Sequence, residues 1–185
     1  AVTAQAMRGE IDFEAAVKQR VGLLEDMDAS KLEEVYTKRV TLMPGAGTLL
    51  ATMQASGARC ALVSGGFDYF AERICARLGF DEFRANRLEI RGGKLTGKVM
   101  EPILGREAKL AAFESYKKDL GLQRGLTMAT GDGANDLAMI KAAGLGVAFR
   151  AKPVVAAEAD AAITHGDLTA LLYLQGYAKD DFVPG

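Results

Sequence analysis

The stretch LTMATGDGANDLAMI, residues 126–140, decides the fold of this 185-residue chain. Its first five residues form a mostly apolar run that ends at Gly131-Asp132-Gly133. A short apolar run closed by glycines is typical of a strand buried on both faces of a parallel sheet. The residues at 136–143 then follow a helical pattern. The stretch therefore predicts a strand, a loop with carboxylates and a helix, in that order.

The same alternation recurs along most of the chain. Residues 60–63 are a second apolar run, followed by Ser64-Gly65-Gly66 and a helical pattern at 69–78. We expect a β-hairpin at 88–96 around Gly92-Gly93, because paired glycines favour tight hairpin turns. A helix at 106–120 and strands at 145–149 and 161–163 complete the series. Alternating strands and helices predict an α/β fold, with a doubly wound parallel sheet similar to a Rossmann fold.

The first 43 residues differ because they are predicted to form helices only. Their apolar residues recur at three- and four-residue steps, and Asp28-Ala29-Ser30 offers a cap for a helix. Pro44-Gly45 then breaks the pattern. We therefore expect a small helical cap domain at residues 1–43 and an α/β core domain at residues 44–185.

Composition argues against several classes of partner. With 23 basic and 24 acidic residues the formal net charge is −1, which does not suit nucleic acid or an anionic membrane surface. No apolar run approaches the roughly 20 residues that span a bilayer, so we expect no membrane partner. The two cysteines, Cys60 and Cys75, lie in apolar patterns that predict buried, reduced thiols in a cytoplasmic protein. His165 is the only histidine, which excludes a multi-histidine zinc site and favours a loop or surface position.

Polar residues follow two of the predicted strands. The first cluster is Ser64-Gly65-Gly66, and the second is the loop at residues 131–136. Ligands of open α/β sheets bind at the carboxyl ends of the strands, so these two clusters should lie side by side. The second cluster holds two carboxylates, Asp132 and Asp136, and the amide of Asn135, and a carboxylate on a strand-end loop is a hard oxygen ligand suited to Mg²⁺. In the first cluster, the Ser64 hydroxyl and the N–H of Gly65 at a predicted helix start suit a phosphate. Lys109 could supply the cation of such a site.

A hydroxyl, backbone N–H groups, a cation and a metal-binding carboxylate together suit phosphoryl transfer, in which positioning and charge neutralisation dominate. Each part also has a purely structural explanation. Ser, Asp and Asn are frequent helix caps, and an isolated lysine on a helix is usually solvated. The combination, rather than any single residue, predicts a phosphate-binding site.

Three short motifs resemble those of haloacid dehalogenase phosphatases: VSGGF at 63–67, Lys109 within REAK, and GDGANDLAMI at 131–140. Three longer stretches, AMRGEIDFEAAVKQRVGLL, ANRLEIRGGKLTGKV and AFRAKPVVAAEADAAI, are similar to the phosphoserine phosphatases of that superfamily. The resemblance implies a sheet of the haloacid dehalogenase type with a cap. It also implies Mg²⁺-dependent hydrolysis of O-phosphoserine to serine and phosphate through an aspartyl-phosphate, the last step of serine biosynthesis.

The resemblance further implies roles for single residues. In the core it assigns catalysis to Ser64, Lys109 and Asp136, phosphate binding to Ser64, Gly65, Lys109 and Asn135, and Mg²⁺ binding to Asp132. In the cap, Met7, Phe13 and Arg20 match positions that enclose the serine part of the substrate, and Arg20 would bind its carboxylate. Without the resemblance, Met7 and Phe13 would be core residues and Arg20 a surface charge.

One part of the family pattern, an Asp-x-Asp-x-Thr string on the first strand, does not occur in these 185 residues. Its first Asp is the nucleophile, and its second is the general acid and base. We expect this string some tens of residues before Ala1, on a central strand between the strands at 61–63 and 126–129. Residues 1–185 alone are therefore expected to be inactive.

Two other functions remain open on the sequence. One is a related phosphatase or phosphotransferase of the same superfamily that acts on another small phosphomonoester. The other is a non-catalytic module that binds phosphate or metal and has lost its nucleophile. The assembly is also open, with a homodimer as one expectation.

Overall fold

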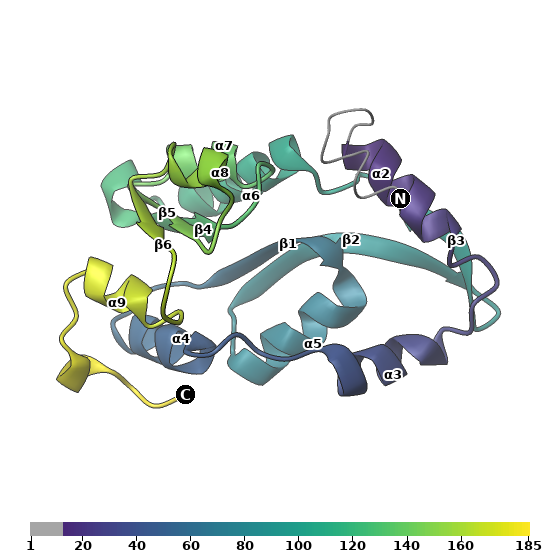
Figure 1. Ribbon diagram of the computed structural model, residues 1–185, viewed down its shortest axis with the longest axis horizontal. Helices are drawn as coiled ribbons and strands as arrows, with labels where there is room; N and C mark the ends of the chain where they lie inside the picture. Colours follow the sequence, from purple (N-terminus) through teal and green to yellow (C-terminus); the bar gives the residue numbers. More distant parts are fainter. Residues whose placement is uncertain (1–12) are drawn as a thin grey trace.

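The computed structural model describes residues 13–185 (Figure 1). The strands are β1 (Ala61–Phe67), β2 (Glu82–Arg91), β3 (Lys94–Met100), β4 (Met128–Gly131), β5 (Leu145–Phe149) and β6 (Ala161–Ile163). The α-helices are α2 (Phe13–Gly22), α3 (Ser30–Arg39), α4 (Ala46–Ala55), α5 (Asp68–Leu78), α6 (Arg106–Asp119), α7 (Leu137–Ala142), α8 (Pro153–Ala156) and α9 (Ala170–Leu174). Short 3₁₀ turns occur at Arg124–Leu126 and Lys179–Asp181.

The strands form two three-stranded sheets, in the orders β1-β2-β3 and β4-β5-β6. All pairs are parallel except β2 with β3. The predicted α/β class with parallel strands is confirmed, but among residues 13–185 the strands do not join into one continuous sheet. β1 and β4 each lie at an edge of their sheet. The additional central strand that the sequence analysis expects would lie between these two strands.

The second sheet is covered by helices on both faces, as a doubly wound arrangement requires. Val147 and Phe149 of β5 are buried in one cluster with Leu171 of α9 and Leu49 of α4. Ala148, between them in the sequence, belongs instead to a cluster with residues of α7 and α8. This alternation follows from the two-residue period of a strand, and the helices lie above and below the sheet in Figure 1. The apolar run at 145–149 is thus buried on both sides, as predicted.

The helices α2 and α3 pack on the hairpin of β2 and β3. Their shared cluster contains Val17, Val21, Leu32, Leu88 and Leu95. The hairpin turns at Gly92 and Gly93, whose φ angles of 56° and 78° are accessible to glycine at little cost. The part of the predicted cap that the structure describes therefore shares its core with residues of β2 and β3. The domain boundary at residue 43 stays a prediction.

Two local expectations are wrong. Ser64-Gly65-Gly66 was expected at a helix start, but these residues extend β1, and α5 begins only at Asp68. The pairing of β1 with β2 shifts register between Val63 and Phe67. Residues 64–66 therefore leave the regular hydrogen-bond ladder, while the strand continues. Leu126 lies in a 3₁₀ turn and is 73% exposed, so β4 begins two residues later than expected.

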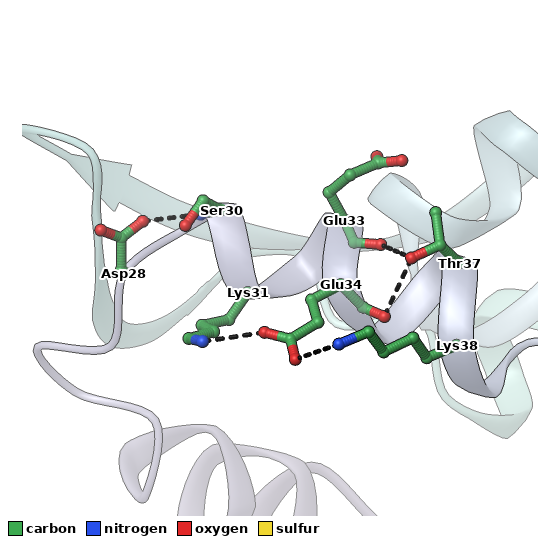
Figure 2. Close-up of polar contacts among 7 residues, drawn as sticks. All are labelled: Asp28, Ser30, Lys31, Glu33, Glu34, Thr37 and Lys38. Atoms are coloured by element: carbon green, nitrogen blue, oxygen red, sulfur yellow. Dashed lines mark hydrogen bonds and ion pairs between the residues drawn. The ribbon is translucent and has the colours of Figure 1, made fainter.

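The helix α3 begins where the sequence offered a cap. The carboxylate of Asp28 accepts the backbone N–H of Ser30 at 2.8 Å. Along the exposed face of the helix, Glu34 binds Lys31 and Lys38, at 2.8 Å and 2.9 Å (Figure 2). Exposed pairs of this kind contribute little to stability, because water and salt screen the two charges. The helix therefore depends on its packing against the hairpin more than on these ion pairs.

Both cysteines are free thiols; Cys60 is half-buried and Cys75 buried. Burial raises the pKa of the Cys60 thiol to about 11, and the negative charge of Asp81 acts in the same direction. The thiolate is the reactive form, so this thiol is inert at neutral pH. His165 is exposed in a loop, as expected. Within residues 13–185, none of the helices has the length and apolar character needed to cross a membrane.

Asp81 fixes the start of β1, and this gives a testable pH dependence. Its carboxylate accepts the N–H of Cys60 at 2.7 Å and binds Arg59 at 2.8 Å. The pKa of Asp81 is lowered, chiefly by the N–H of Cys60. A lowered carboxyl pKa stabilises the fold above the unfolded value of about 4, and this stabilisation is lost as pH falls through the folded value.

We therefore expect Asp81→Asn to lower the melting temperature clearly at pH 7 and by less at pH 3, as measured by thermal unfolding at both values. Asp180→Asn is the matched control, since Asp180 is exposed and has no hydrogen bond or ion pair with any residue at 13–185. An equal loss for Asp81→Asn at both pH values would contradict this account.

Candidate functional site

The loop after β4 is organised by the carboxylate of Asp136. Its Oδ1 binds Nζ of Lys109 at 2.5 Å. Its Oδ2 accepts the backbone N–H groups of Gly133 at 3.0 Å and Asp132 at 3.3 Å. Lys109 and Asp136 are only 6% and 5% exposed. One buried carboxylate thus joins the helix α6 to the strand-end loop.

Two glycines of this loop are needed because side chains fold back over them. A Cβ atom at Gly131 would lie 2.5 Å from Cβ and Cγ of Asp136. A Cβ atom at Gly133 would lie 2.4 Å from Oδ1 of Asn135. Real Cβ atoms do not approach other heavy atoms so closely. The glycines in the GDGAND string are therefore required by the position of the polar side chains that follow them.

The end of β1 lies beside this loop. A Cβ atom at Gly65 would lie 3.7 Å from Nδ2 of Asn135, so the two polar clusters meet as the sequence predicted. The Oγ of Ser64 accepts the N–H of Gly66 at 3.0 Å, which leaves its own hydroxyl proton free to donate. The backbone here is extended strand rather than a helix start. Its donors, and not the dipole of α5, are what the site offers to an anion.

Asp132 lies in the same loop with an exposed side chain. Within residues 13–185 this carboxylate has no hydrogen bond or ion pair, and no three acidic, histidine or cysteine side chains gather as a complete metal site. Mg²⁺ is often held by one or two carboxylates, with substrate phosphate and water as its other ligands. A free carboxylate on a loop fixed by Asp136 fits such an ion.

Phe13, the first residue of α2, covers the site from the cap side. Its Cζ would lie 3.2 Å from a Cβ atom at Gly65, and its Cδ1 would lie 3.3 Å from one at Gly105. Arg20 is exposed, on the face of α2 that carries Phe13, since seven residues make nearly two full turns. Arg20 forms no ion pair with the described residues. The remaining predicted cap residue, Met7, lies outside the described residues.

Sequence reasoning missed Asn86, which is 1% exposed. Its Nδ2 donates to the carbonyl of Gly65 at 2.9 Å, and its Oδ1 accepts the N–H of Leu104 at 2.6 Å. The predicted hairpin began only at residue 88, whereas β2 begins at Glu82, so Asn86 fell outside every predicted strand. Asparagine is depleted in strands, and its sequence position therefore gave no signal for this role.

The close approach at Gly131 gives a prediction about stability. Gly131→Ala places a methyl group against Asp136, and such overpacking costs about 1–3 kcal/mol. Gly125→Ala is the matched control, because a Cβ atom there meets nothing within 4 Å. We expect urea unfolding to show the loss for Gly131→Ala alone. Equal stability of the two variants would contradict the proximity of Asp136 to Gly131.

A family model described as haloacid dehalogenase-like hydrolase matches residues 3–141. A phosphoserine phosphatase of Streptomyces coelicolor is 44% identical over 97% of this chain, which spans only 44% of that relative. A phosphoserine phosphatase of Idiomarina loihiensis is 42% identical over 93% of this chain and 78% of its own length. A solved structure described as a phospho-aspartyl intermediate analogue of phosphoserine phosphatase is 40% identical, with a TM-score of 0.87 over 94% of this chain and 82% of that one. The chain therefore belongs to the haloacid dehalogenase-like hydrolases and, within them, to the phosphoserine phosphatase group.

Proposed function

We propose that these residues form most of an enzyme that hydrolyses O-phosphoserine to serine and phosphate. The observation that carries the proposal is the buried Lys109–Asp136 pair, in the loop after β4 whose Asn135 side chain lies beside Gly65 of β1. It is supported by the phosphoserine phosphatase names of relatives that match nearly all of the chain.

The proposed reaction has two steps. A carboxylate attacks phosphorus, the bond from phosphorus to the serine oxygen breaks, and that oxygen takes a proton from a carboxylic acid. Water then gives a proton to the second carboxylate, which is left ionised by the first step, and attacks the phosphorus of the aspartyl-phosphate. This releases phosphate and restores both the nucleophilic carboxylate and the carboxylic acid. Both steps build negative charge on the phosphoryl oxygens, so catalysis depends on groups that neutralise it.

This chain supplies four such groups. The Ser64 hydroxyl, the Gly65 N–H and the Asn135 amide would donate hydrogen bonds to the phosphoryl oxygens. Lys109 would contribute positive charge, and Asp136 would keep its ammonium group in place. Asp136 is fully engaged with Lys109 and with two backbone N–H groups, so it is unsuited to act as the nucleophile.

We propose that the nucleophilic carboxylate lies on a strand between β1 and β4, outside the 185 residues. Within the described part of the chain, each of these strands pairs on one side only, although Gly65 of β1 lies beside the side chain of Asn135 in the loop after β4. An unpaired buried backbone group costs about 1–3 kcal/mol, so a strand that paired with both edges would also stabilise the core.

Asp132 would hold Mg²⁺, and the ion would supply positive charge at the phosphoryl group. In the cap, which we propose to comprise residues 1–43, Phe13 would enclose the serine part of the substrate together with Met7. The Arg20 guanidinium would bind the substrate carboxylate through two parallel hydrogen bonds. A cytoplasmic location, with which the two free thiols are consistent, stays a prediction. The homodimer also stays a prediction.

The test measures phosphate release from O-phosphoserine by the full-length protein, with Mg²⁺ and with EDTA. We expect turnover that EDTA abolishes. Release of phosphate from other small phosphomonoesters with no reaction of phosphoserine would contradict the proposed substrate. Transfer of phosphate to an added hydroxyl acceptor would identify a phosphotransferase. Binding of phosphate without turnover would identify a non-catalytic module.

The role of Arg20 has a specific signature. A charge-assisted hydrogen bond contributes about 1.5–3 kcal/mol, so Arg20→Ala should raise KM for phosphoserine by about 10- to 100-fold. KM for p-nitrophenyl phosphate, which has no carboxylate, should stay unchanged. Arg39→Ala, on an exposed arginine at the end of α3, is the control and should affect neither substrate. Equal effects of Arg20→Ala on both substrates would contradict carboxylate recognition.

A further inference from the structure

Asn86 is a buried polar residue to which the proposed reaction assigns no part. It lies on β2 at the point where this strand changes its neighbour. Asn86 is opposite Phe67 of β1, and the next residue, Arg87, is opposite Met100 of β3. With 1% of its surface exposed, Asn86 is among the most deeply buried polar side chains of residues 13–185. Burying an amide is costly unless its groups find hydrogen-bond partners.

Both ends of the Asn86 amide bind backbone groups rather than side chains. The Nδ2 group donates to the carbonyl of Gly65 at 2.9 Å, and Oδ1 accepts the N–H of Leu104 at 2.6 Å. Since one partner accepts and the other donates, the orientation of the amide is fixed. An apolar side chain of the same size could make neither bond.

The two partners belong to the two segments that carry the phosphate ligands. Gly65 lies in the irregular part of β1, where the ladder with β2 shifts register between Val63 and Phe67. Leu104 precedes Gly105, whose carbonyl accepts the backbone N–H of Lys109 at 3.0 Å in the first turn of α6. Asn86 therefore sets the distance between the donors at the end of β1 and the helix that positions the Lys109 cation.

The cap contacts the same two segments. The ring of Phe13 lies against Gly65 with one edge and against Gly105 with the other. A change in the spacing of these glycines would therefore also displace the ring that covers the site. In catalysis, a displacement of about 1 Å at a binding group can cost roughly 100-fold in rate.

We propose that Asn86 is a positioning residue, which holds the Gly65 backbone and the start of the Lys109 helix at the separation that a phosphoryl group requires. This inference rests on the proposed phosphatase function, because it assigns phosphate binding to these two segments.

The decisive variants are Asn86→Leu and Asn86→Asp. Asn86→Leu removes both hydrogen bonds, and we expect kcat/KM for phosphoserine to fall by roughly 10- to 100-fold. In Asn86→Asp, burial raises the pKa of the new carboxyl. The protonated form can donate to Gly65 and accept from Leu104, whereas the charged form repels the Gly65 carbonyl. The activity of Asn86→Asp relative to the wild type should therefore rise as pH falls from 8 to 5.5.

Thr52→Val controls for the loss of a buried polar group. Thr52 is also 1% exposed, and its Oγ1 accepts the N–H of Val183 at 2.9 Å, in contact with the C-terminal segment and not with the site. It should lower the melting temperature without changing kcat/KM. If Asn86→Leu does not fold, the pH profile of Asn86→Asp decides. A profile parallel to that of the wild type would overturn the proposal.

Titration calorimetry with inorganic phosphate separates this inference from the proposed function. A wild type that binds phosphate but does not hydrolyse phosphoserine would overturn the function alone. In that case Asn86→Leu, or Asn86→Asp at pH 8, should still weaken phosphate binding at least about 10-fold. Unchanged phosphate affinity in both variants would overturn the role of Asn86. A wild type that neither binds nor hydrolyses would overturn both proposals.

Discussion

The contact between Lys109 and Asp136 is the constraint on which the rest of the site depends. Taking two charges out of water is expensive, and the cost is recovered only when geometry is good and the remaining oxygens are hydrogen-bonded. Asp136 meets this condition, with one oxygen on Lys109 and the other on the N–H groups of Asp132 and Gly133. The loop has to fold tightly around this carboxylate, and glycine at 131 is what leaves room for it.

The helix α6 connects the two sheets at their carboxyl ends. Its entry is tied to β1 through Leu104, the Asn86 amide and Gly65. One turn further along, Lys109 is tied to the loop after β4 through Asp136. The donors of β1, the cation of α6 and the carboxylates after β4 are thereby held together, although these parts come from distant segments of the chain. The proposed nucleophile strand would enter between the two sheets without disturbing either tie.

The sequence predicted the features that are determined locally. The apolar run at 145–149 and the paired glycines at 92 and 93 gave β5 and the hairpin, because burial and turn geometry act over a few residues. The short helix at 170–174 has no strong pattern and was not foreseen. The extended backbone at Ser64 was missed because it arises from an irregular register with β2. The role of Asn86 was missed because its partners lie 21 and 18 residues away in the sequence. Motif resemblance predicted roles for Lys109 and Asp136 in one site, and the structure brings the two side chains into contact.

A double-mutant cycle on the Lys109–Asp136 pair tests this account most directly. Lys109→Met leaves a buried carboxylate without its partner, which should cost about 3–5 kcal/mol in the free energy of unfolding. Adding Asp136→Asn removes that uncompensated charge, so the double variant should be more stable than the sum of the two single losses predicts. Urea denaturation of the wild type and the three variants gives the coupling energy. A coupling of about 1 kcal/mol or more would support the pair as the organising contact. Additive losses would show that the two charges do not interact and would contradict the account.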